Sequence, residues 1–352
     1  MTEETDAVRA AQLEVLAAAH AMTNERTDAL SQEEFSASYP DPAPWRIGPF
    51  RRDDALAFEL TGQWDDPAGV GWTSESIFNP TIAPDGDGLL MAYRAAPRKE
   101  SLGSRIGIAR WQHGAWADDA ANPAILPADL DEALGCEDPK LYRLGERWFL
   151  FYNGIFRIDD ELREHYPSTG YPLDDVGCDI RLAVSDDGGR TWTRVGTVLD
   201  RSVSRLWAKA AVIPRNGAGE PVRIGGSYLM FVSEGCDGVQ HVGRSDDLVH
   251  WDFTPQPFLD LAPIGGHLHE VACVALEHGD ESFVLDFFYR DADDRFAAGQ
   301  ALYDAADPFA PRELARGGSL SWGGLSRWRG EWLFGQGWDA APGRREILIY
   351  RG

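Results

Sequence analysis

The sequence predicts an all-β fold, a five-bladed β-propeller with an N-terminal α-helical extension. From about residue 45 onward, short runs of aromatic and β-branched residues alternate with turns of Gly, Asp and Pro, which is typical of many short antiparallel strands. One unit of three or four such runs recurs five times at spacings of roughly 50–70 residues. Radial repetition of small sheets defines a propeller. We expect residues 1–44 to form the extension and residues 45–352 the propeller.

The segment from about Glu4 to Ser36 places Ala and Leu at helical spacing among acidic residues, which predicts one amphipathic helix or two. Such a helix either packs on the body of the protein or makes a homo-oligomer. The acidic N-terminus lacks a basic region followed by an apolar one, and no apolar run approaches the roughly 20 residues of a membrane span. The sequence therefore predicts a cytoplasmic protein without a signal peptide.

The five repeated units begin near residues 79, 138, 209, 269 and 323. The first polar residue of each innermost strand is expected to face the axial funnel, where small-molecule sites form. These residues are Asn79, Asp138, Lys209, Glu270 and, in the fifth unit, Trp322. A TIM barrel would need long helical patterns after residue 45, and a β-sandwich would not give five similar units.

Two hairpins carry a structural signature of propellers. Residues 185–192 read Ser-Asp-Asp-Gly-Gly-Arg-Thr-Trp, the pattern of an Asp box, and residues 245–251 form the equivalent hairpin one unit later. We expect Asp187 to bond to turn amides and Trp192 to pack between blades. These hairpins support the fold and say nothing of catalysis.

Composition limits the classes of partner. The formal net charge of −24 argues against nucleic acid and anionic membranes, because both require clustered Lys and Arg. Four scattered cysteines without a C-x-x-C pair indicate neither a zinc site nor a redox motif. No cofactor and no metal is therefore expected. The thirteen tryptophans can pack between sheets or stack on sugar rings.

The tetrapeptide Glu137-Asp138-Pro139-Lys140 places two carboxylates immediately before a hydrophobic strand. Here the chain resembles glycoside hydrolase family 130, the β-mannoside phosphorylases and β-mannosidases, five-bladed propellers whose second blade opens with Glu-Asp-Pro-Arg. The resemblance extends from about residue 79 to about residue 312. It also rests on residues 79–80 with 93–95, 207–214 and 298–308.

The resemblance implies an acid and a set of ligands. Asp138 would be the general acid that protonates the glycosidic oxygen, and Glu137 would position it or raise its pKa. Asn79 and Arg94 would hold the sugar at the non-reducing end. In a phosphorylase, inorganic phosphate would attack the anomeric carbon, and it needs fixed cations. The residues that carry over by position are Arg94, Arg181 and Lys209.

The chain departs from the family pattern around the expected phosphate site. Lys140 replaces the family's Arg, and a His-Arg pair of the third blade corresponds to residues 232–233, followed by Glu234. Glu270 lies in a segment that replaces Pro-Pro-Ile. Carboxylates here would repel phosphate, and Glu270 would serve as the base for water in an inverting hydrolase, which needs acid and base about 6.5–9.5 Å apart.

Alternative interpretations remain for these residues. Glu270 could instead bind a substrate hydroxyl or form a structural ion pair, and Glu234 could be a solvated loop end rather than a substrate contact or base. His267 and His269 flank Glu270 and are expected to bind sugar hydroxyls. An H-x-H pair without further ligands is a weak indication of a metal.

The sequence therefore predicts an inverting glycosidase that acts on a β-linked oligosaccharide, a β-mannoside. Three alternatives stay open: a β-mannoside phosphorylase that uses inorganic phosphate, a furanosidase on a related propeller, and a non-catalytic carbohydrate-binding propeller. A sialidase is disfavoured because the sequence shows no arginine triad.

Overall fold

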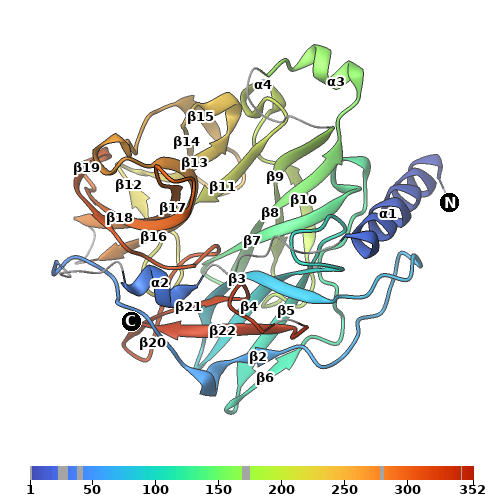
Figure 1. Ribbon diagram of the computed structural model, residues 1–352, viewed down its shortest axis with the longest axis horizontal. Helices are drawn as coiled ribbons and strands as arrows, with labels where there is room; N and C mark the ends of the chain where they lie inside the picture. The colour runs from blue at the N-terminus through green and yellow to red at the C-terminus, as the bar shows by residue number, and fades with distance from the viewer. Residues whose placement is uncertain (1, 23–30, 38–42, 169–174, 278–280, 342) are drawn as a thin grey trace.

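Five sheets surround a central axis in the computed structural model, which describes residues 2–22, 31–37, 43–168, 175–277, 281–341 and 343–352 (Figure 1). Each sheet is built from antiparallel neighbours, and the sheets follow one another along the chain. The five-bladed propeller and the N-terminal helix are thus confirmed. No helix of the described residues is long and apolar enough to span a membrane.

The first four blades each use consecutive strands. The first contains β3 (Ser76–Asp85), β4 (Gly88–Ala96), β5 (Arg105–Gln112) and β6 (Ala115–Asp118). The second contains β7 (Gly135–Leu144), β8 (Arg147–Arg157), β9 (Val176–Ser185) and β10 (Thr193–Thr197). The third contains β11 (Ala208–Val212), β12 (Arg223–Ile224), β13 (Ser227–Gly235), β14 (His241–Ser245) and β15 (Asp252–Pro255). The fourth contains β16 (His267–Glu277), β17 (Ser282–Arg290), β18 (Phe296–Asp304) and β19 (Asp307–Arg316).

The fifth blade joins the two ends of the chain. Its strands β20 (Ser326–Trp328), β21 (Glu331–Gln336) and β22 (Glu346–Arg351) are completed by β1 (Arg51–Arg52) and β2 (Phe58–Glu59), both of which pair with β22. Arg51 lies opposite Arg351, and the Asp53 amide donates to the Ile349 carbonyl oxygen at 2.8 Å. Pairing the first part of the chain with the last closes the ring.

Two helices precede the propeller, α1 (Glu3–Ala21) and α2 (Gln32–Ala37). One face of α1 is buried through Val8, Gln12, Val15 and Ala19, and Val15 packs in a cluster with residues of the second blade. The helix therefore packs on the body of the protein, one of the two roles expected of it. Short helices occur in the loops: η1 (Asp54–Leu56), η2 (Leu130–Glu132), α3 (Asp160–His165), α4 (Arg201–Ser204), η3 (Cys236–Gly238) and η4 (Ala262–Ile264).

Apolar clusters fill the spaces between adjacent blades. Leu90 and Leu150 share the cluster between the first and second blades, and Phe231 shares another with Phe283 of the fourth. In the Asp box, Asp187 accepts hydrogen bonds from the amides of residues 190 and 191, at 3.0 and 2.9 Å, and Trp192 packs against the first of these clusters. The hairpin has the structural role that the sequence indicated.

Candidate active site

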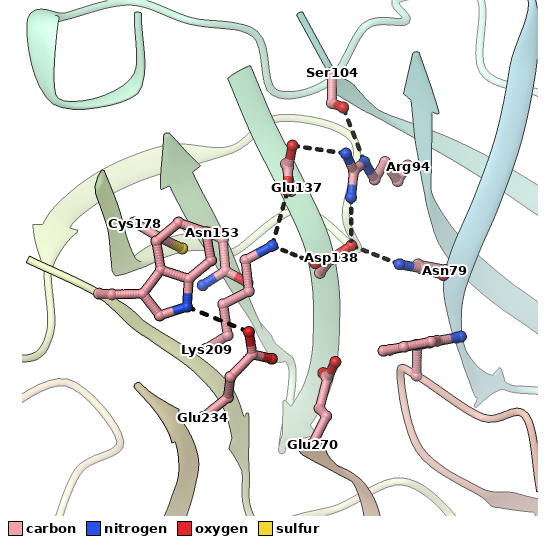
Figure 2. Close-up of polar contacts among 12 residues, drawn as sticks. Asn79, Arg94, Ser104, Glu137, Asp138, Asn153, Cys178, Lys209, Glu234 and Glu270 are labelled. Atoms are coloured by element: carbon pink, nitrogen blue, oxygen red, sulfur yellow. Dashed lines mark hydrogen bonds and ion pairs between the residues drawn. The ribbon is translucent and has the colours of Figure 1, made fainter. Parts of the chain in front are cut away.

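The inner strands of four blades bring polar side chains to the axis. Asn79 comes from β3, Asp138 from β7, Lys209 from β11 and Glu270 from β16. Figure 2 shows Glu234 and Glu270 directed toward the same space that Asp138 and Lys209 face. The structure therefore places together four of the five residues that the repeat pattern assigned to the axis. The fifth, Trp322, precedes β20, and its side chain packs in an apolar cluster.

Bulges in the first two inner strands turn Asn79 and Asp138 inward. Both residues precede a proline and have left-handed φ values of 46° and 48°. At the same points the pairing of β3 and β7 shifts register. Asn and Asp tolerate the left-handed region better than most residues, and a bulge re-aims a side chain. The Asn-Pro and Asp-Pro pairs therefore give the first two blades equivalent polar positions.

The third blade supplies its side chain one position earlier. There the left-handed residue is Ala210, with φ 55°. Lys209 pairs with Glu234 across the strand in the way that Glu137 pairs with Asn153. Lys209 thus corresponds to Glu137 rather than to Asp138, although it still reaches the axis because its side chain is long.

Two carboxylates and two cations alternate in a buried cluster (Figure 2). Arg94 donates from Nη2 to Glu137 Oε1 at 2.6 Å and from Nη1 to Asp138 Oδ1 at 3.1 Å. Lys209 Nζ lies 3.0 Å from Glu137 Oε2 and 3.4 Å from Asp138 Oδ2. Arg94 is also held by Ser104 Oγ, at 2.8 Å. Since buried charges are tolerated only when paired, this pairing explains how the cluster is accommodated.

The surroundings of Asp138 favour its ionised form. Burial by itself would raise the pKa of Asp138. The charges of Lys209 and Arg94, and a hydrogen bond of 2.7 Å from the side-chain amide of Asn79, together hold that pKa well below its ordinary value. Asn79 is oriented in turn by Trp338, whose Nε1 donates to Asn79 Oδ1 at 2.6 Å. The sequence reasoning missed Trp338, which follows β21 in a Gly-Gln-Gly-Trp segment without a family motif.

The pKa of Glu270 is shifted in the opposite direction from that of Asp138. Its carboxyl is 3% exposed, and among the described residues it makes one ion pair, with Lys140 Nζ at 3.5 Å from Oε1. Burial raises the pKa of Glu270 to about 8; Lys140 opposes the rise, while the charges of Glu234 and Asp138 add to it. The surroundings of Glu270 therefore favour its protonated form.

The remaining expected ligands lie at the margin of the cluster. Glu234 is half-buried and accepts a hydrogen bond from Trp207 Nε1 at 3.3 Å. His269 is half-buried against the Phe296 ring, at a centroid distance of 5.0 Å, and burial lowers the pKa of His269. His267 is exposed at the start of β16.

Arg181 lies in a different cluster. Its guanidinium donates to both carboxylate oxygens of Asp129, at 2.8 and 2.7 Å, and lies 3.5 Å from Glu132. No ion pair of the described residues joins it to Glu137 or Asp138. The structure therefore does not bring Arg181 together with Arg94 and Lys209.

No group of three or more His, Cys, Asp or Glu side chains that could hold a metal ion occurs among the described residues. A cavity of about 710 Å³ lies outside the axial cluster, where α1, η2 and α3 meet; its lining includes Ala11, Asp131 and Leu162. None of the axial residues lines it. The candidate site is thus defined by the converging side chains.

The fold and the buried cluster define a class of protein, a five-bladed propeller with paired carboxylates and cations at its axis. The model of glycoside hydrolase family 130, described as beta-1,4-mannooligosaccharide phosphorylase, matches residues 64–165. This segment contains Asn79, Arg94, Glu137 and Asp138. The match confirms the resemblance to the family and supports a carbohydrate-active enzyme. No curated protein matches the sequence.

Solved structures share the fold at low sequence identity. A glycosyl hydrolase from Bacteroides ovatus is 17% identical, with a TM-score of 0.64 over 88% of this chain and 95% of that one. A β-1,2-mannobiose phosphorylase from Listeria innocua is 14% identical, with a TM-score of 0.59 over 86% of this chain and 96% of that one.

Proposed function

We propose that this protein is an inverting glycosidase that cleaves a β-mannoside by transfer to water. The observation that carries the proposal is the placement of two buried carboxyls, Asp138 and Glu270, on inner strands of different blades. Their surroundings shift the two pKa values in opposite directions. Two carboxyls whose environments separate their pKa values supply the acid and the base of glycoside hydrolysis. The family match supports a mannoside as the substrate class.

The contacts favour Glu270 as the proton donor and Asp138 as the base, the reverse of the roles expected from the sequence. Both Asp138 oxygens already accept hydrogen bonds or contact a cation, so this carboxylate is held in the ionised form that a base requires. Glu270 keeps its proton near neutral pH, and an acid whose pKa lies near the working pH is efficient.

Hydrolysis then proceeds in one displacement. Glu270 transfers its proton to the glycosidic oxygen as the bond from that oxygen to the anomeric carbon breaks. Asp138 takes a proton from a water whose oxygen attacks the opposite face of that carbon. The products are two free sugars, one with inverted anomeric configuration. Glu270 is left ionised and Asp138 protonated, and exchange with solvent restores both.

The charge balance supports water as the nucleophile. The two cations nearest Asp138, Arg94 and Lys209, are both paired with carboxylates. A phosphate dianion would have to displace those partners, and each like-charge contact at 4 Å costs about 4 kcal/mol at an effective dielectric of about 20. A phosphorylase is the second candidate, favoured by the description of the matching family and by Arg94 and Lys209 at the site.

Product analysis tests the proposal. The protein is incubated with β-1,2- and β-1,4-mannobiose, with and without inorganic phosphate, and the products are separated and quantified. We expect free mannose at the same rate in both conditions. Mannose 1-phosphate that forms only with phosphate would make the protein a phosphorylase. Binding of a mannoside without either product would favour a carbohydrate-binding propeller, and cleavage of furanosides alone would favour a furanosidase.

A further inference from the structure

Lys140 connects three blades at the axis. Its side chain rises from β7 of the second blade and is 4% exposed. The ammonium contacts Glu270 Oε1 of the fourth blade at 3.5 Å and donates to the carbonyl oxygen of Trp322, in the loop that leads to the fifth. A buried ammonium is stable only when its donors are used. These two contacts therefore fix where the charge lies.

The backbone beside Lys140 is anchored as well. The amide of Leu141 donates to Thr81 Oγ1 at 3.1 Å, and that hydroxyl donates to the Gly323 carbonyl at 3.0 Å. Arg215 donates from Nη1 to the Leu141 carbonyl at 3.1 Å. The root of the Lys140 side chain is thus tied to the first, third and fifth blades. This anchored backbone and the contact with the Trp322 carbonyl together hold the ammonium beside Glu270.

We propose that Lys140 is the positioning residue of Glu270: fixed by the Trp322 carbonyl, its ammonium holds the Glu270 carboxyl in place across the axis and favours its ionised form. The inference rests on the proposed function, in which Glu270 donates the proton. In the family pattern this position holds an arginine, so the lysine is a feature of this chain.

Four charged groups on neighbouring strands act on the Glu270 carboxyl. Asp138 from β7 and Glu234 from β13 favour its protonated form, whereas Lys140 from β7 and Lys209 from β11 oppose it. Lys140 has the largest opposing influence, since among the described residues it is the one that forms an ion pair with Glu270. His269 lies beside Glu270 on β16, and burial lowers its pKa. It is therefore neutral in the pH range near 8 in which Glu270 titrates.

Removing the ammonium should therefore raise the pKa of Glu270. Activity that depends on protonated Glu270 is lost as pH rises through that pKa. In Lys140→Met the alkaline limb of the kcat–pH profile should move to higher pH, by about 1–3 pH units for loss of one adjacent opposite charge. If Glu270 acted instead as the base, the acidic limb would move in the same direction.

Infrared difference spectroscopy gives a readout that does not depend on activity. The C=O band of the protonated carboxyl, identified by subtracting the spectrum of Glu270→Gln, is followed against pH in each background. We expect a shift of about 1–3 pH units in Lys140→Met and in Lys140→Gln, whose amide can still donate to the Trp322 carbonyl. Lys140→Arg keeps the charge and should restore a titration near that of the wild type.

Lys99→Met is the matched control. Lys99 also donates to a tryptophan carbonyl, that of Trp338, at 3.2 Å, but it does not contact Glu270. Its substitution should leave the titration unchanged. An unshifted band in folded Lys140→Met and Lys140→Gln would overturn the proposal. A second outcome separates the two proposals. If the band shifts in the Lys140 variants but Glu270→Gln keeps full activity, the proposed function is contradicted and the role of Lys140 is left intact.

Discussion

Asp138 and Glu270, on two sides of the propeller axis, are buried to nearly the same extent but differ in the pKa that their surroundings give them. Asp138 is 5% exposed and Glu270 is 3% exposed. On the β7–β11 side, Asp138 has an amide and two cations as partners. On the β16 side, Glu270 has a single ammonium, at 3.5 Å. Since burial is nearly the same, the number of cationic partners decides which carboxyl keeps its proton.

A third buried carboxyl shows that neutral donors have a weaker effect. Asp286 on β17 is fully buried and accepts hydrogen bonds from Gln300 and from the amide and hydroxyl of Ser319. Burial nevertheless raises the pKa of Asp286 to about 7, with those hydrogen bonds and, more weakly, the charge of Arg46 acting against the rise. Several neutral donors therefore do not replace the two cations that Asp138 has.

The largest expected effect is on turnover. Asp138→Asn and Glu270→Gln should each lower kcat on a β-mannobiose by about 10²–10⁴-fold, the usual contribution of one general acid or base. Circular dichroism should show a folded protein in both cases. Wild-type turnover in either variant would remove that residue from the reaction and break the comparison between the two sides.

Removing Arg94 should lower the free energy of unfolding of the protein more than removing Lys140. Arg94→Met leaves Glu137 and Asp138 to share Lys209, and loss of one partner from a buried ion pair costs about 3–5 kcal/mol. Lys140→Met should cost less, because Glu270 can remain protonated. The free energy of unfolding, measured in denaturant, checks the order. Equal losses would mean that Glu270 is as firmly ionised as Asp138.

The smallest effect concerns the pH dependence of stability. The folded-state pKa of Glu270 lies near 8, above its ordinary value of 4.5. Its contribution to stability is therefore fully present below pH 4.5 and is lost as pH rises through about 8. Glu270→Gln should remove this loss, which near pH 6 amounts to about 2 kcal/mol or less. The low pKa of Asp138 acts oppositely, since its contribution is lost only as pH falls below 3.8.

Substitutions of two other buried carboxyls, Asp286 and Asp138, are the controls for this measurement. Asp286→Asn should remove a further part of the decline toward alkaline pH, because the pKa of Asp286 is raised to about 7. Asp138→Asn should leave that decline in place and change stability in acid instead. An unchanged decline in Glu270→Gln would show that Glu270 is ionised over the whole range.

Local sequence patterns were sufficient for the blades and for the convergence on the axis. Strand and turn alternation gave the five units, and the first polar residue of four inner strands marked Asn79, Asp138, Lys209 and Glu270. The closing strand β1 escaped this reasoning, because two residues carry no detectable period. It is recruited by pairing with β22, almost the whole chain away.

Contacts between distant segments decided the rest of the site. Arg181 is drawn to Asp129, which lies 52 residues away in a loop whose position the pattern of strands does not fix. Lys140 donates to the carbonyl oxygen of Trp322, which lies 182 residues away in the sequence. The proton affinities of Asp138 and Glu270 follow from such partners, so the adjacent carboxylates of residues 137 and 138 could not reveal them.

Leaving-group dependence tests the central claim most directly, that Glu270 gives the proton and Asp138 activates the water. Turnover of Glu270→Gln and Asp138→Asn is compared on a β-mannobiose and on a dinitrophenyl β-mannoside, whose leaving group needs no proton. We expect Glu270→Gln to recover most of its turnover on the aryl mannoside and Asp138→Asn to stay slow on both. Recovery in Asp138→Asn alone would show that Asp138 is the acid and would contradict the account.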